Sequence, residues 1–384
     1  MKKVIDLFAG CGGLSLGFQN AGFSIVGAFE NWAVAAHCYS LNFKHPVFQE
    51  DLSNVNIVLS KLRLIRPDIV IGGPPCQDFS NAGKRIESKR AGLTESFAEI
   101  VTKLHSPYFV MENVDRAETS LSYSRARYIF TQAGYGLTEI VLDASLCGVP
   151  QKRKRFFCIG ALNAKNGFLL KEINAKLSNR PMTLRDFFGN TLDFEFYYRH
   201  PRNYNRRAIF SIDEPAPTIR GVNRPVPKGY HGHPNDSHRL DKSIRALTTL
   251  ERALIQTFPA NFKWIGSKTD MEQMIGNAVP VKMAEFIANQ LKSYIINKER
   301  KIGFIDYSGF RVWLANKSNL SLRTQRDVIS RLKRADSILP ISSHEYYTFQ
   351  LEGMLKKKEI CSSVISHLKR SVKLYSQYRN QKGI

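Results

Sequence analysis

One cysteine stands in a position suited to nucleophilic chemistry. Cys76 follows Pro74-Pro75 and precedes Gln77, shortly after the apolar run at residues 69–71. The prolines stiffen the chain, and a loop at the end of a strand exposes its side chains. This thiol is therefore poorly placed for a buried core and well placed to attack a bound ligand.

An acid and two arginines end or begin later runs of this kind. Glu112 follows the run at residues 108–111, and Arg153 and Arg155 alternate at the start of the run that leads into residues 156–159. A carboxyl group in an apolar crevice can stay protonated and donate a hydrogen bond. Alternation along a strand sends the two arginines to one face. The same arginine pattern also fits a solvated run of charge.

A glycine-rich stretch near the N-terminus has the form of a ligand-binding turn. Residues 6–13 (DLFAGCGG) join a strand-like run to a helix-like one, and glycines there let the backbone approach a ligand. The stretch is not the dinucleotide fingerprint, because the third glycine of GxGxxG would fall at Ser15. Glu30 and Asp51 follow the next two strand-like runs, where carboxylates can accept from ribose hydroxyls or an adenine amine.

The runs that carry these residues alternate with helix-like stretches. Apolar runs without alternation are typical of buried parallel strands, and strands alternating with helices are typical of an open α/β sheet. Ligands of such sheets lie beyond the carboxyl ends of the strands. The expected strands cover residues 4–8, 24–29, 47–50, 69–71, 108–111, 137–142 and 156–159, and the expected helices cover residues 14–21, 33–42 and 96–104.

Length and charge indicate two or three domains that face a polyanion. The chain has 384 residues and a formal net charge of +23, and its 43% hydrophobic content fits a folded protein. Residues 1–150 hold 14 basic and 14 acidic side chains, 151–299 hold 25 and 13, and 300–384 hold 17 and 6. We therefore expect a neutral catalytic part followed by nucleic-acid-binding parts.

Other features exclude several classes of protein. No apolar run is long enough for a membrane segment or a secretory signal, so a soluble cytoplasmic protein is expected. The six cysteines show neither disulfide nor zinc spacing, and no metal is expected.

Six motifs in a fixed order make the chain resemble the DNA (cytosine-5)-methyltransferase family over residues 1–295. The resemblance implies an α/β, Rossmann-like class I methyltransferase fold, a doubly wound sheet with a smaller DNA target-recognition domain and, here, a helical C-terminal extension. The motifs are residues 6–13, Glu30-Asn31-Trp32, Pro74-Pro75-Cys76-Gln77, Glu112-Asn113-Val114, Gln151-x-Arg153-x-Arg155 and Gly276-Asn277-Ala278-Val279-Pro280.

The resemblance also implies a reaction. Cys76 would add to C6 of a cytosine flipped out of double-stranded DNA, and C5 would take a methyl group from S-adenosylmethionine. Glu112 would stabilise N3 and the 4-amino group, and Arg155, together with Arg153, would hold the cytosine carbonyl. The implied S-adenosylmethionine-binding residues are Asp6, Phe8, Ala9, Gly10, Gly12, Gly13, Leu14, Glu30, Asn31, Trp32, Asp51, Leu52, Pro74, Asn277, Ala278 and Val279.

DNA contacts are expected from two segments. One is the loop after Cys76, which resembles the family's loop that closes over the flipped base. The other, the recognition segment, is the basic stretch between Thr248 and the strand expected to carry Arg153 and Arg155, the arginine strand. Arginine can read guanine in the major groove, and lysine contacts phosphates. The candidates are Gln77, Ser80, Lys84 and Arg85 in the loop, and Arg220 and Arg224 in the recognition segment.

These expectations divide the chain into four parts. Residues 1–160 form the S-adenosylmethionine-binding catalytic domain, 161–265 the target-recognition domain, 266–299 a return to the catalytic domain, and 300–384 a basic helical extension. The extension shows apolar stripes of helical spacing, and no internal repeat is apparent in the chain. It is expected to contact DNA outside the recognition site or to dimerise, and the protein is expected to act as a monomer on DNA.

The expected function is protection of host DNA as the modification half of a restriction system. One alternative is the tRNA-methylating branch, but its Cys-Phe-Thr signature is absent and the long basic recognition segment favours DNA. A second alternative is a regulator that mainly binds DNA. The intact Cys76, Glu112 and Arg155 argue against a purely binding role. Leu250 stands where the family more often has Arg, which affects only the support of the recognition segment.

Overall fold

The chain divides into two units. This structure is a computed structural model that describes residues 1–75, 92–201, 203, 205–303, 306–317, 320–339, 341, 347–357 and 360–382. The units are Met1–Lys292 and Ser293–Ile384, and their boundary falls within helix α10 (Val281–Gly303). Within the described ranges, no helix is long and apolar enough to cross a membrane.

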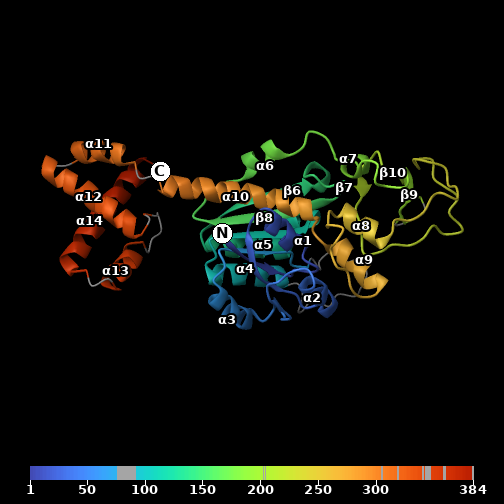
Figure 1. The fold of residues 1–384 in the computed structure, drawn as a ribbon, viewed down its shortest axis with the longest axis horizontal. Coiled ribbons are helices and arrows are strands. Elements are labelled where there is room, and N and C mark those ends of the chain that lie inside the picture. Colours follow the sequence, from blue (N-terminus) through green and yellow to red (C-terminus); the bar gives the residue numbers. More distant parts are fainter. Residues whose placement is uncertain are drawn as a thin grey trace. The chain divides into compact units, whose positions relative to one another are not determined.

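A seven-stranded sheet forms the centre of the first unit (Figure 1). The strand order is β3-β2-β1-β4-β5-β8-β6. The first five strands in this order are mutually parallel, as expected from their continuous apolar runs. The strands are β1 (Lys3–Leu7), β2 (Ser24–Phe29), β3 (Val47–Phe48), β4 (Ile69–Gly72), β5 (Tyr108–Val114), β6 (Tyr135–Asp143) and β8 (Lys154–Leu162).

Strand β8 departs from the expected parallel arrangement. It lies between β5 and β6 and runs antiparallel to both. Only η2 (Ala144–Leu146) and β7 (Gln151–Lys152) connect β6 to β8, without a crossover helix. A parallel return needs such a crossover, so this short connection forces the chain to turn back.

Helices cover both faces of the sheet. One face packs on α3 (Val55–Ile65), α4 (Leu93–Leu104) and α5 (Leu121–Gln132), and Ile5 and Leu7 of β1 belong to this apolar cluster. Side chains alternate along a strand, so Asp6 points to the other face. There its carboxylate accepts a hydrogen bond from Ser15 of α1 (Gly13–Asn20). Helix α2 (Ala33–Ser40) follows β2, and η1 (Asp115–Thr119) follows β5.

The segment after β8 has little regular structure. The pair β9–β10 is antiparallel, and β11 pairs with β7 in a parallel register that sets Ala216 opposite Gln151. The chain then returns to the sheet through a helix that leads to Asn277. These elements are α6 (Leu170–Lys176), α7 (Leu184–Phe188), β9 (Phe196–Tyr198), β10 (Ile209–Ser211), β11 (Ala216–Pro217), α8 (Thr249–Ile255) and α9 (Lys268–Asn277).

The second unit is helical, as expected. Its apolar core includes Phe310, Leu332, Leu355, Leu368 and Tyr375. Helices that bury one face each explain the apolar stripes in the sequence of the extension. Beyond the end of α10, the helices are α11 (Tyr307–Lys317), α12 (Leu322–Ile338), α13 (Tyr347–Lys357) and α14 (Ser362–Lys382).

Candidate active site

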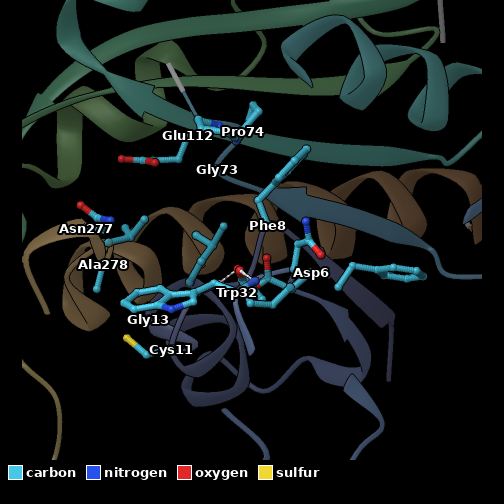
Figure 2. Close-up of a pocket in the computed structure, with 18 of the residues that line it drawn as sticks. Asp6, Phe8, Cys11, Gly13, Trp32, Gly73, Pro74, Glu112, Asn277 and Ala278 are labelled. Carbon is cyan, nitrogen blue, oxygen red and sulfur yellow. Dashed lines mark hydrogen bonds between the residues drawn. The ribbon is translucent and has the colours of Figure 1, made fainter. Parts of the chain in front are cut away.

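A cavity of about 650 Å³ lies at the carboxyl ends of β1, β2, β4 and β5. Figure 2 shows Glu112 and Pro74 on one side of it and Trp32 and Gly13 on the other, with Asn277 at the rim. Every residue expected to bind the methyl donor lines this cavity except Gly12. The lining also includes Cys11, Pro75, Asn113 and Val114, which belong to the motifs but were not among the expected binding residues. Lining residues that no motif contains are Phe29, Glu50, Gly73, Leu93 and Met274.

The glycine-rich turn is held in place by Glu30. One carboxylate oxygen of Glu30 accepts from the backbone N–H of Gly10 and the other from that of Trp32, each at 2.7 Å. Burial raises the pKa of Glu30, and these two amide donors partly oppose that rise. Gly12 has φ +97°, a left-handed conformation that favours glycine, and a Cβ there would lie 2.4 Å from the Phe43 ring. The turn is therefore preorganised around the carboxylate of Glu30.

Asp6 begins a buried chain of hydrogen bonds. Ser15 Oγ donates to Asp6 Oδ2 at 2.6 Å, and the Tyr39 hydroxyl donates to Ser15 Oγ at 2.6 Å. Tyr39 also lies 2.7 Å from Nε2 of His45. Asp6 Oδ1 is buried and has no hydrogen-bond partner among the described residues. A cationic ligand in the cavity would supply the interaction that Asp6 lacks.

We expect Asp6 to make stability depend on pH. Burial raises the pKa of Asp6 to about 7, so the folded chain keeps a proton that the unfolded chain has lost between about pH 4 and 7. Stability from this group is therefore greatest at low pH and falls as pH rises through 7. In urea unfolding at pH 5 and pH 8, Asp6→Asn should flatten this fall by roughly 2–3 kcal/mol. Parallel pH profiles for the variant and the wild-type chain would contradict the assignment.

Glu112 and Arg155 form an ion pair at the cavity wall. They lie on the antiparallel strands β5 and β8, and Arg155 Nε is 2.8 Å from Glu112 Oε1. Their side chains are 10% and 14% exposed, respectively. Burial raises the pKa of Glu112, while the charges of Arg155 and Arg153 partly oppose the rise. A carboxyl with a raised pKa can donate a proton or a hydrogen bond at neutral pH.

Arg153 has a different environment from Arg155. It stands between β7 and β8, is fully buried and does not line the cavity. Its guanidinium donates to the carbonyls of Ile219 at 2.8 Å, Gly276 at 2.9 Å and Ala278 at 3.2 Å. The break between the two strands explains why simple alternation does not bring both arginines to the cavity. Arg153 instead joins the arginine strand to the segments that carry Ile219 and Asn277.

The thiol expected to act as the nucleophile lies outside the described residues, as do Gln77, Ser80, Lys84 and Arg85. Pro75, which directly precedes Cys76 in the sequence, lines the cavity. Cys11 also lines the cavity, but burial raises the pKa of its thiol well above the usual value. A thiol with a raised pKa is a poor nucleophile because the thiolate is the reactive form.

A second cavity, of about 660 Å³, adjoins the first and is strongly basic, and we call it the basic cleft. Val114 and Arg155 line both cavities. Arg220 lines the basic cleft and donates to the His200 carbonyl at 2.6 Å. Arg224 is exposed and lies outside the lining. The cations that line the basic cleft are Lys152, Lys154, Arg155, Arg199, Arg206, Arg207 and Arg220, against one acid, Asp115.

Most of these cations were not singled out from the sequence. Lys152 and Lys154 belong to the run that fits solvated charge, and Arg199, Arg206 and Arg207 stand in a segment without regular periodicity. A dense basic composition is the signal that indicated the segment as a whole. Only the fold brings it beside the arginine strand, through the pairing of β11 with β7.

Buried polar groups fix the recognition segment to the sheet. Gln151 donates to Gln256 at 2.7 Å and accepts from the backbone N–H of Ile219 at 2.9 Å. Arg252 forms a buried ion pair with Glu272 and donates to the Arg220 carbonyl. Each of these groups is satisfied within the junction, as buried polar groups must be. Leu250, the departure from the family pattern, is exposed and takes no part.

Across the parts of the chain that the structure describes, no group of three or more His, Cys, Asp or Glu side chains could hold a metal ion.

The sheet, the glycine-rich turn and the cavity at the strand ends define a methyltransferase of the Rossmann-like class. Residues 2–293 match the family described as C-5 cytosine-specific DNA methylase, and the chain belongs to this family. It is a DNA cytosine-5 methyltransferase that acts on DNA and requires a methyl donor. The expected family, fold class and enzyme class are thereby confirmed.

Two relatives and one solved structure show how far the similarity extends. The chain is 56% identical over 301 residues to the type II methyltransferase M.HindV of Haemophilus influenzae, covering 78% of this chain and 98% of that protein. It is 52% identical over 294 residues to the type II methyltransferase M.HgiDI of Herpetosiphon aurantiacus, covering 76% and 95%. The crystal structure of S. pombe Dnmt2 methyltransferase has the same fold, with a TM-score of 0.59 at 18% identity, covering 77% of this chain and 99% of that one.

Proposed function

We propose that the chain is a type II modification methyltransferase that transfers the methyl group of S-adenosylmethionine to C5 of a cytosine within a specific double-stranded sequence. The observation that carries this proposal is the sharing of Arg155 and Val114 between a basic cleft and the cavity. DNA held by the cleft places a flipped cytosine beside Glu112 and Arg155. The similarity to M.HindV and M.HgiDI supports the restriction-modification role.

The cavity fits S-adenosylmethionine in size and chemistry. Glu30 and Asp51 offer carboxylate acceptors for the ribose and adenine, and the Trp32 indole offers a flat apolar surface for the base. Asp6 has a buried oxygen without a partner, which suits the cationic methionine end of the molecule. Bound S-adenosylmethionine would supply a sulfonium methyl group to the site.

The chain's own groups prepare cytosine to accept a methyl group. Aromatic C5 is a weak nucleophile, and addition of the Cys76 thiolate to C6 forms an S–C6 bond and makes C5 an enamine carbon. The charge that develops on N3 has to be stabilised in the transition state. After C5 has gained the methyl group, its proton passes to water and the S–C6 bond breaks to release the Cys76 thiolate. N3 then returns its proton to Glu112, and aromaticity is restored.

Glu112 and Arg155 would divide the work on the base. A protonated Glu112 donates to N3, which the raised pKa of this carboxyl favours. Arg155 holds the cytosine carbonyl, and its Nε, 2.8 Å from Glu112 Oε1, keeps the Glu112 carboxyl group oriented. Arg153 acts as a positioning residue, because its Nη1 and Nη2 groups donate to the carbonyls of Ile219, Gly276 and Ala278.

The residues that would recognise DNA lie in the basic cleft and in the recognition segment. Lys152, Lys154 and Arg206 contribute phosphate contacts, and Arg220 and Arg224 contribute base or phosphate contacts. We assign loop contacts to Gln77, Ser80, Lys84 and Arg85 by the family resemblance. The four-part division at residues 160, 265 and 299 and action as a monomer are part of the same proposal.

Methylation of unmethylated genomic DNA tests the proposed function directly. The purified chain is incubated with S-adenosylmethionine and the DNA, which is then sequenced at base resolution by a method that separates C5 from N4 methylation. We expect 5-methylcytosine within one short sequence motif. Methylation of tRNA in place of DNA would contradict the proposal and move the chain to the tRNA-methylating branch. Absence of methylation on both would favour a binding role.

Trp32→Ala should weaken the binding of the methyl donor without a comparable effect on the rate of methyl transfer. Stacking of a base on an aromatic side chain is worth about 1–3 kcal/mol, so the Kd for S-adenosylmethionine should rise by roughly 5–150-fold. The kcat at saturating methyl donor should change by less than about threefold, because Trp32 lies on the side of the cavity opposite Glu112. Trp32→Phe keeps an aromatic face and serves as the control. A kcat loss at unchanged Kd would contradict this role.

A further inference from the structure

The second unit contains a repeated helix pair. Helices α11 and α13 each have 11 residues, and their first residues, Tyr307 and Tyr347, are 40 positions apart. The long helices α12 and α14 also begin 40 positions apart, at Leu322 and Ser362. The expectation that the chain lacks an internal repeat is therefore wrong. Few residues are identical at the 40-residue step, so the repeat is one of helix positions and burial rather than of sequence.

The long helices share more than their position in the pair. Residues 328–334 of α12 read VISRLKR and residues 364–370 of α14 read VISHLKR, so they differ only at Arg331 and His367. The two segments are 36 positions apart, about one helical turn less than the 40-residue step between the helices, so they occupy similar faces of the two helices one turn out of register. Leu332 and Leu368 are buried in the core, and Arg334 and Arg370 are exposed. The shared heptapeptide thus puts an apolar side chain inward and an arginine outward on both helices.

Each long helix presents an exposed stripe at helical spacing. The α12 stripe and the α14 stripe contain no apolar side chain, and most of their members can donate hydrogen bonds to phosphate oxygens. An interface between protein copies normally has an apolar centre, which neither stripe offers. The α12 stripe is Arg323, Arg326, Asp327, Ser330, Lys333 and Arg334, and the α14 stripe is Ser363, Ser366, His367, Arg370, Lys373 and Gln377.

The acidic side chains of α11–α14 that the structure describes mostly lie outside the two stripes, so the stripes keep a net positive charge. Asp306 accepts from Tyr378 and from the backbone N–H of Gly309. Asp336 accepts from the backbone N–H of Ile341, and Glu352 pairs with Lys356 and Lys369. Helix α14 has five basic residues and no acidic residue. Asp327 is the one acid within the two stripes as defined here.

We propose that the α12 and α14 stripes bind the phosphate backbone of duplex DNA without reading its sequence. The second unit lies beyond the region that matches the family, which ends at residue 293, so this binding adds to the contacts of the basic cleft. DNA is the substrate of this family, and a surface of arginine, lysine, serine and histidine complements it in charge and in hydrogen bonding.

The salt dependence of binding tests this proposal in the full chain. The affinity for a duplex that extends well beyond one target site is measured without methyl donor at several salt concentrations. Loss of one phosphate contact lowers the slope of log K against log salt by about 0.9. Arg323→Gln, Arg326→Gln and Arg334→Gln together should lower it by up to about 2.7, and Arg370→Gln with Lys373→Gln by up to about 1.8.

The matched control replaces Arg323, Arg326 and Arg334 by Lys, which keeps the charge and should keep the wild-type slope. Circular dichroism confirms that each variant is folded. A slope unchanged by both sets of Gln substitutions would overturn the proposal, and so would an unchanged slope accompanied by loss of self-association in sedimentation. Because binding is read without methylation, failure of the proposed catalytic chemistry would not alter the reading.

Discussion

Cys76→Ala is expected to lower the rate of methyl transfer by at least about 10⁴-fold, because removal of a catalytic nucleophile leaves only the contribution of binding and electrostatics. The affinity for DNA should change by only a few fold, since the cations that line the basic cleft remain. The measurement is single-turnover transfer of labelled methyl to a duplex that carries the target sequence.

Cys11→Ala is the matched control for this prediction. Cys11 lines the same cavity, and its thiol lies 3.8 Å from the Met274 carbonyl. Its raised pKa keeps it in the unreactive thiol form, so the variant should retain activity within a few fold. Loss of activity in the Cys11 variant together with retained activity in the Cys76 variant would contradict the prediction, because it would identify Cys11 as the nucleophile.

Glu112→Gln should lower kcat by about 10²–10³-fold, the size of effect seen when one group that stabilises developing charge is removed. The amide can still donate a hydrogen bond to N3 but cannot transfer a proton. The Kd for S-adenosylmethionine should stay within a few fold, because Glu112 lies on the side of the cavity opposite Trp32.

The pH profile gives this prediction a second readout. Burial raises the pKa of Glu112, and the protonated form is the active one, so wild-type kcat should fall as pH rises through that pKa. The Gln variant should lack this fall. Glu139→Gln is the control, since Glu139 accepts from Arg127 at 2.9 Å and does not line the cavity. An unchanged pH profile in the Glu112 variant would contradict the assigned role.

The strands of the sheet were predictable because local sequence patterns indicate each of them. The runs around Ile5, Val70 and Val110 are continuous, apolar and bounded by polar or glycine residues, which is the pattern of strands buried on both faces. The cavity was predictable for the same reason. Chemistry-bearing residues directly follow these strands, and the carboxyl ends of parallel strands share one edge of the sheet.

Features that depend on contacts between distant segments were not predictable. The burial of Arg153 depends on carbonyls at Ile219 and Gly276, which are 66 and 123 positions away in sequence. The ion pair of Arg252 with Glu272 depends on the packing of α8 against α9. The gathering of cations in the basic cleft depends on the pairing of β11 with β7. Periodicity reports which face of an element is buried, but not which segment covers it.

A covalent trap tests the central claim, that Cys76 adds to cytosine C6, most directly. The chain is incubated with S-adenosylmethionine and a duplex in which 5-fluorocytosine replaces the target cytosine. Fluorine cannot leave C5 as a cation in the way a proton leaves, so the S–C6 bond cannot be released after methylation. Proteolysis and mass spectrometry should then show the methylated base attached to the peptide that contains Cys76. An adduct on the Cys11 peptide, or no adduct under conditions in which the unmodified duplex is methylated, would contradict the account.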